Sequence, residues 1–78
     1  MLRIQVLEKQ FAEAVARLTT EQQEQNVRLA EHGERLCSAY WTFNTDCNQL
    51  ENFNGYHETV LEALLICFEG VINSLEAN

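Results

Sequence analysis

The most reactive side chains in this sequence belong to three cysteines, Cys37, Cys47 and Cys67, and two histidines, His32 and His57. The cysteines lie ten and twenty residues apart, without the paired CxxC steps that are typical of zinc sites. On a helix, ten residues span about 15 Å, which is too far for two ligands of one metal ion. We therefore interpret the cysteines as free thiols that pack as small apolar side chains, and we predict no metal site.

Neither histidine lies in a pattern that resembles a nucleophile with its base or a cluster of ligands. The sequence also lacks a glycine-rich phosphate loop, a Walker motif and a calcium loop. A small helical protein offers little concave volume for a substrate. We predict that the protein is not an enzyme, and that it has no catalytic residue and no cofactor.

Length and composition indicate a single all-α domain over residues 1–78. The chain has 78 residues, of which 46% are apolar and 22% are charged, so it has the composition of a folded protein. It contains no proline and three glycines, and therefore has few residues that force a helix to end.

The clearest periodic segment is the last one, which we predict to be an amphipathic helix over residues 56–76. Its apolar side chains recur at steps of three and four residues, and its glutamates do the same on the opposite face. The pair Asn54-Gly55 immediately before it predicts a turn, with Gly55 in the left-handed conformation. The apolar positions are Leu61, Leu64, Phe68, Val71 and Leu75.

A second apolar stripe enters the same turn from the other side, which predicts a helical hairpin. If the two helices are antiparallel around Asn54-Gly55, Phe43 lies near Leu65 and apolar layers meet apolar layers. The stripe consists of Leu29, Leu36, Tyr40, Phe43, Cys47 and Leu50.

The segment before this stripe has an apolar face of its own but no partner in a simple hairpin. We favour one long N-terminal helix, straight or kinked near residues 19–20, because Leu7, Leu18, Leu29 and Tyr40 recur every eleven residues. In that helix Gln22 and Gln25 would either form a polar layer in the seam or belong to an exposed polar stretch. The alternative is a three-helix bundle, in which residues 2–18 fold back and Thr20 with Gln23 forms a capping box.

The apolar helical surface exceeds what one small chain can bury, so we predict self-association. A core of this size contributes only about 3 to 5 kcal/mol, and the sequence predicts neither a disulfide nor a metal site to supplement it. We expect a homodimer of hairpins, either a coiled coil or a four-helix arrangement. The candidate self-association residues are Leu7, Phe11, Leu18, Leu61, Leu64 and Phe68.

Charge is distributed unevenly along the chain, whose net charge is -7. Residues 1–35 carry five bases and six acids, whereas residues 36–78 carry six acids and no base. This balance argues against direct nucleic-acid binding. The acidic half is either a solvated face or a surface that attracts a protein partner with a basic surface. The longest uncharged run, residues 36–45, is too short to span a membrane, and the first residues lack a signal-peptide pattern, so we expect a cytoplasmic protein.

Trp41 is the aromatic residue that the core pattern explains least, because Tyr40 and Phe43 already occupy the predicted seam. Trp and Tyr are enriched at binding hot spots, so our candidate partner-binding residues are Cys37, Tyr40, Trp41 and Ile66. A dimer mate could also cover this patch. We hypothesise a small interaction module that binds and regulates or inhibits another protein, as an adaptor or antiactivator does. The alternative is a structural or assembly subunit, or a chaperone, of a larger helical complex.

Overall fold

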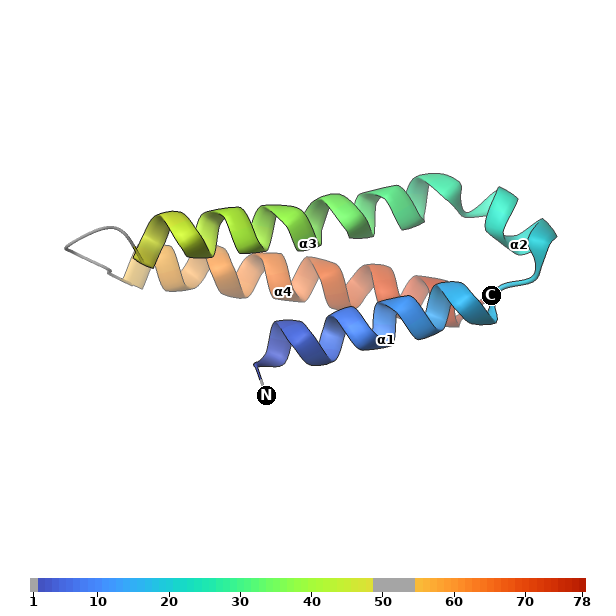
Figure 1. The fold of residues 1–78 in the computed structure, drawn as a ribbon, viewed down its shortest axis with the longest axis horizontal. Helices are drawn as coiled ribbons and strands as arrows, with labels where there is room; N and C mark the ends of the chain where they lie inside the picture. The colour runs from blue at the N-terminus through green and yellow to red at the C-terminus, as the bar shows by residue number, and fades with distance from the viewer. Residues whose placement is uncertain (1, 49–54) are drawn as a thin grey trace.

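A computed structural model describes residues 2–48 and 55–78, and every regular element in those ranges is a helix. The all-α class is therefore confirmed, and the C-terminal helix begins within one residue of the predicted position. Asn54 lies outside the described residues; Gly55 is the first residue of the last helix and does not adopt the predicted left-handed conformation. The helices are α1 (Arg3–Arg17), α2 (Thr20–Gln25), α3 (Val27–Asn48) and α4 (Gly55–Glu76) (Figure 1).

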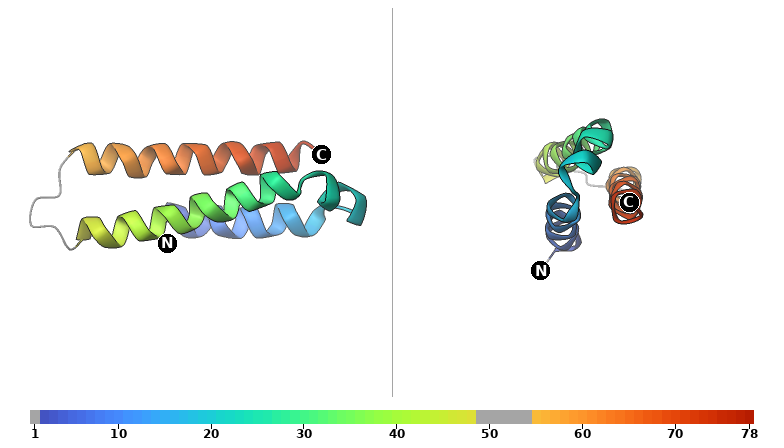
Figure 2. Two further views of the ribbon diagram at one scale, coloured as in Figure 1. Left: turned by 90° about the horizontal axis from the view of Figure 1, so that it is seen from above. Right: turned by 90° about the vertical axis from the view of Figure 1, so that its right-hand side faces the viewer.

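The three long helices pack side by side in an elongated bundle of 48 × 23 × 15 Å. α3 and α4 form the predicted antiparallel hairpin, and α1 packs against both of them. Seen end-on, α1, α3 and α4 occupy the corners of a triangle (Figure 2). The ring of Phe43 on α3 lies 5.8 Å from the ring of His57 on α4.

The preferred continuous N-terminal helix is wrong: the chain bends between α1 and α2, as in the three-helix alternative. Leu18 and Thr19 both have extended backbone angles, with ψ of 140° and 166°. The backbone N–H of Gln22 donates to Thr19 Oγ1, and the backbone N–H of Thr19 donates to Gln22 Oε1. This capping box lies one residue before the predicted one and satisfies donors at the start of α2.

Two further polar side chains stabilise the bend. The Gln23 amide donates to the carbonyl oxygens of Leu18 and Val15, which satisfies acceptors at the C-terminal end of α1. The Asn26 amide donates to the carbonyl oxygen of Gln22 and to Asn78 Oδ1, so the short connecting helix is tied to the end of α4. The predicted polar layer does not form, because Gln22 caps a helix and Gln25 is exposed.

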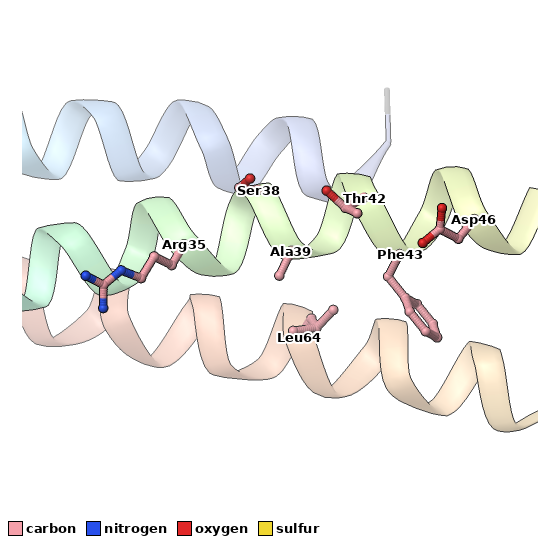
Figure 3. A pocket seen from close by; sticks show the side chains of 7 residues that line it. All are labelled: Arg35, Ser38, Ala39, Thr42, Phe43, Asp46 and Leu64. Atoms are coloured by element: carbon pink, nitrogen blue, oxygen red, sulfur yellow. The ribbon is translucent and has the colours of Figure 1, made fainter.

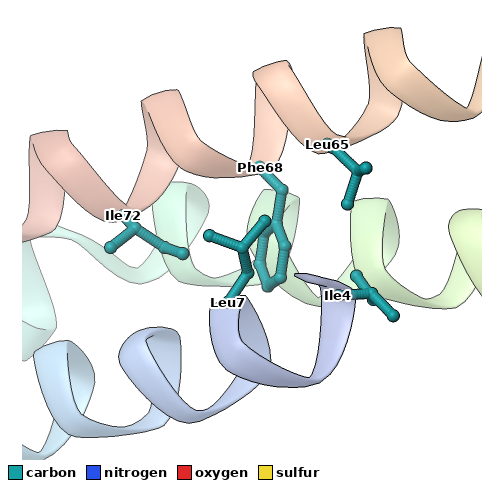
Figure 4. Packing of buried hydrophobic residues seen from close by; sticks show 5 residues of the cluster. All are labelled: Ile4, Leu7, Leu65, Phe68 and Ile72. Atoms are coloured by element: carbon teal, nitrogen blue, oxygen red, sulfur yellow. The ribbon is translucent and has the colours of Figure 1, made fainter. Parts of the chain in front are cut away.

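The bend allows α1 to bury its apolar face within its own chain. Ile4 and Leu7 pack against the apolar face of α4, with the ring of Phe68 at the centre (Figure 4). Nearer the bend, Ala14 and Leu18 form a second cluster with α4. Burial of each large apolar side chain contributes roughly 1.5 to 3 kcal/mol to the free energy of unfolding. The buried residues of α4 are Leu65, Phe68, Val71, Ile72 and Leu75.

Candidate interaction surfaces

The three thiols are free and lie in three different environments. Cys37 is half-buried, Cys47 is buried and Cys67 is exposed. Burial raises the pKa of the Cys37 thiol, and the nearby Glu8 carboxylate raises it further. Burial, followed by the charge of Asp46, raises the pKa of the Cys47 thiol. Both effects favour the neutral thiol over the reactive thiolate.

The two histidines do not join these thiols in a cluster. His32 is exposed on α3, and His57 is half-buried on α4 with its ring close to those of Phe43 and Tyr56. In the described ranges, no group of three His, Cys, Asp or Glu side chains could hold a metal ion.

The residues predicted to bind a partner occupy two different environments. Cys37, Tyr40 and Trp41 lie on α3 and pack against the core cluster that contains α1 residues. Trp41 Nε1 donates to Glu8 Oε1 at 3.0 Å, and its ring meets that of Tyr40 edge-on with centroids 5.7 Å apart. Ile66, by contrast, is 56% exposed on α4 and does not take part in this packing.

Half of the residues predicted to mediate self-association are buried inside one chain. Leu7, Leu18 and Phe68 have exposed fractions of 5%, 8% and 1%. Phe11 is half-buried, and its ring lies 5.3 Å from that of Phe68. Leu61 and Leu64 are half-buried on α4 and retain surface that a second molecule could cover.

One edge of α4 carries an acidic stripe, which we define as Glu58, Glu62, Glu69 and Glu76. These residues are four or seven positions apart, so they share one face of the helix, and α4 contains no lysine or arginine. The guanidinium of Arg3 spans two members of the stripe. Its Nη1 lies 2.8 Å from Glu62 Oε1 and its Nη2 lies 2.6 Å from Glu69 Oε1.

The Arg3 contact shows what the acidic stripe can do chemically. Two glutamates two helical turns apart hold one guanidinium, and Arg3 Nε adds a third hydrogen bond to Glu69. The two carboxylates raise the pKa of the guanidinium, chiefly through these hydrogen bonds to Glu69 and Glu62. Among the described residues, no base lies within ion-pair distance of Glu58 or Glu76. The glutamate spacing was visible in the sequence, but the role of Arg3 depended on the fold of α1.

A groove of about 510 Å³ lies between α3 and α4 (Figure 3). Arg35 and Asp46 stand at its two ends on α3, and Leu64 contributes from α4. Of the described lining residues, Leu64 and Phe43 belong to the apolar stripes predicted from the sequence. The others are of types that are common on a solvent-facing helix surface. The described lining consists of Arg35, Ser38, Ala39, Thr42, Phe43, Asp46 and Leu64.

Comparisons of this chain with protein-family models, with curated proteins and with solved structures find no match. Within the described residues, no helix is both long enough and apolar enough to cross a membrane. Because the comparisons find no match, we infer the function of this protein from two of its surfaces, the acidic stripe and the α3/α4 groove.

Proposed function

We propose that this protein is a small helical interaction module that acts in the cytoplasm. It binds a basic surface of another protein through the acidic stripe and regulates that protein by covering the surface. The observation that carries this proposal is the Arg3 clamp, in which the stripe already binds one guanidinium between Glu62 and Glu69. A partner's arginine or lysine side chains are the chemical equivalent of Arg3.

The remaining charges of the stripe favour the same class of partner. Glu58 lies one turn before Glu62, and Glu76 lies two turns after Glu69, so the stripe extends beyond the clamp in both directions. Both side chains are exposed. A partner with bases at similar spacing could therefore pair with them without displacing Arg3, and α4 itself carries no lysine or arginine that would repel it.

Ile66 supplies an apolar contact beside these charges. It lies between Glu62 and Glu69 in the sequence and is 56% exposed. An interface with a basic partner would remove this side chain from water, which adds a short-range apolar contribution to the long-range attraction of the glutamates. The combination supports a specific contact in preference to diffuse attraction alone.

The proposal is tested with a pair of variants that remove equal charge. Glu58→Gln with Glu76→Gln removes two charges from the stripe, and Glu13→Gln with Glu34→Gln removes two exposed charges elsewhere. The probe is a synthetic helical peptide with two arginines eighteen residues apart, the separation of Glu58 and Glu76 in the sequence, with binding followed by fluorescence anisotropy. We expect the stripe variant to weaken binding about tenfold and the control variant less than about twofold.

Salt and a cell extract complete the test. Binding through the stripe should weaken as salt rises, because the screening length falls from about 10 Å at 0.1 M to about 3 Å at 1 M. A protein captured from extract should elute with salt and be lost from the stripe variant alone. Equal loss with both variants would contradict the proposal. A partner that stays bound at high salt would instead indicate the structural or assembly role.

A further inference from the structure

We propose that the α3/α4 groove is the interface of a homodimer, in which α3 of one copy packs antiparallel against α3 of a second copy. The groove is on a different face from the acidic stripe, so the dimer does not depend on the proposed function. The occupant of the groove is a second copy of this chain, and the interface is related by a two-fold axis near the middle of α3.

The groove lies on the face of the hairpin that α1 leaves open. On α3, Cys37 and Trp41 face α1, as their contacts with Glu8 show. The groove residues Arg35, Ala39, Thr42 and Asp46 lie roughly 150° around the axis of α3 from the side that faces α1. No described lining residue belongs to α1. A further helix can therefore approach this face without displacing α1.

The charges along the groove are self-complementary. Arg35 precedes Ala39 by four residues, and Asp46 follows Thr42 by four residues. This row of α3 residues therefore has the same spacing when it is followed in the opposite direction, with the positive and negative charges exchanged. A two-fold axis between Ala39 and Thr42 places Arg35 of each copy beside Asp46 of the other. A foreign helix would match this pattern only if it repeated it.

The middle of the groove permits close approach of two helices. Ser38, Ala39 and Thr42 are small, so two α3 backbones can come near each other. Phe43 and Leu64 are half-buried and present apolar surface at the sides. On α4 the positions in helical register with Leu64 that are not buried, namely Val60 and Cys67, carry no charge. The pairing joins two hairpins into a four-helix arrangement.

The other exposed face of α4 is unsuited to self-association. The acidic stripe contains four glutamates and no base of its own helix. A two-fold axis through it would bring carboxylates of two copies together, which disfavours association. The structure thus separates a surface that can pair with itself from one that needs a partner of opposite charge.

Charge exchange across the groove tests the proposal. The variants are Arg35→Glu, Asp46→Arg and the double variant, and both positions are exposed, so the core is untouched. Sedimentation velocity from about 1 to about 200 µM gives the dimer dissociation constant, and circular dichroism confirms helicity. Each single variant should weaken the dimer about 10- to 100-fold, because two attractive pairs become repulsive.

Restoration is the decisive result. The double variant should dimerise like the wild type, because the exchange of charges recreates both attractive pairs. An equimolar mixture of the two single variants should form heterodimers. In such a heterodimer the introduced carboxylate at position 35 of one chain meets the introduced guanidinium at position 46 of the other, and the unchanged Asp46 meets the unchanged Arg35.

A control and two contrary outcomes complete the experiment. Lys9→Glu and Glu13→Arg, which reverse exposed charges on α1, should leave the dimer unchanged. A wild type that stays monomeric over the whole concentration range overturns the proposal. A mixture no more associated than either single variant overturns it as well, because the two-fold pairing requires charge exchange to restore the contact.

Discussion

The ring of Phe11 on α1 lies against the bare backbone of Gly33 on α3. A Cβ atom built on Gly33 would come within 2.4 Å of Phe11 Cε2 and 2.8 Å of Cζ. The same ring lies 5.3 Å from that of Phe68 on α4, so it joins all three long helices. Gly33 is buried within α3, where its lack of a side chain makes room for α1.

This contact predicts different effects of two glycine-to-alanine substitutions. Gly33→Ala forces the Phe11 ring to shift and should lower the free energy of unfolding, whereas a Cβ at Gly70 on α4 meets nothing within 4 Å. Both changes gain about 1 kcal/mol of helix propensity. Overpacking costs roughly 1 to 3 kcal/mol, so we expect Gly33→Ala to be less stable than Gly70→Ala by that amount. Urea denaturation of the two variants measures the difference, and equal midpoints would contradict the close approach.

The bend between α1 and α2 predicts which of two adjacent threonines matters. Thr19→Ala removes the side-chain acceptor of the Gln22 N–H and should lower the free energy of unfolding by about 1 kcal/mol. Thr20 is the first residue of α2 and is exposed, so Thr20→Ala should change stability by less than about 0.5 kcal/mol. Thermal unfolding followed by circular dichroism distinguishes the two. A larger loss at Thr20 would support the later capping box.

Alkaline pH should destabilise the fold in part through Cys37. Its pKa in the folded state is raised by burial and by Glu8, so the fold favours the neutral thiol. This contribution is fully present below the unfolded pKa of about 8.5 and is lost as pH rises through the folded value. We expect Cys37→Ala to flatten the decline in stability above about pH 8.5, and Cys67→Ala, at an exposed position, to leave it unchanged. Parallel curves for all three proteins would contradict the assignment.

The elements with the strongest helical periodicity could be predicted from the sequence. Leu61, Leu64, Phe68, Val71 and Leu75 recur every three or four residues, and the Asn54-Gly55 pair before them placed the predicted start of this helix within one residue of the observed start of α4. The bend between α1 and α2 was harder to predict, because the sequence signals for a continuous helix and for a break were close in strength. An eleven-residue repeat favoured continuity, whereas the capping pattern of the threonines favoured a break.

The two surfaces differ in how far the sequence indicated them. The acidic character of the C-terminal half was plain from its lack of bases, and the spacing of its glutamates indicated a stripe. The clamp by Arg3 and the groove around Ala39 were not predicted, because each depends on where α1 lies. The residues predicted to bind a partner likewise do not share one environment in the structure. Trp41 donates a hydrogen bond to Glu8 on α1, whereas Ile66 is exposed on α4.

The amino-acid sequence by itself determined the helical class, the identity of the apolar faces and the sign of the surface charge, because these follow from residue type and spacing along one helix. Only the tertiary structure decided which apolar face covers which. That choice depends on the free energy of burying α1 against α4 after the turn at Thr19, a long-range balance between apolar burial and chain reversal that no local pattern records.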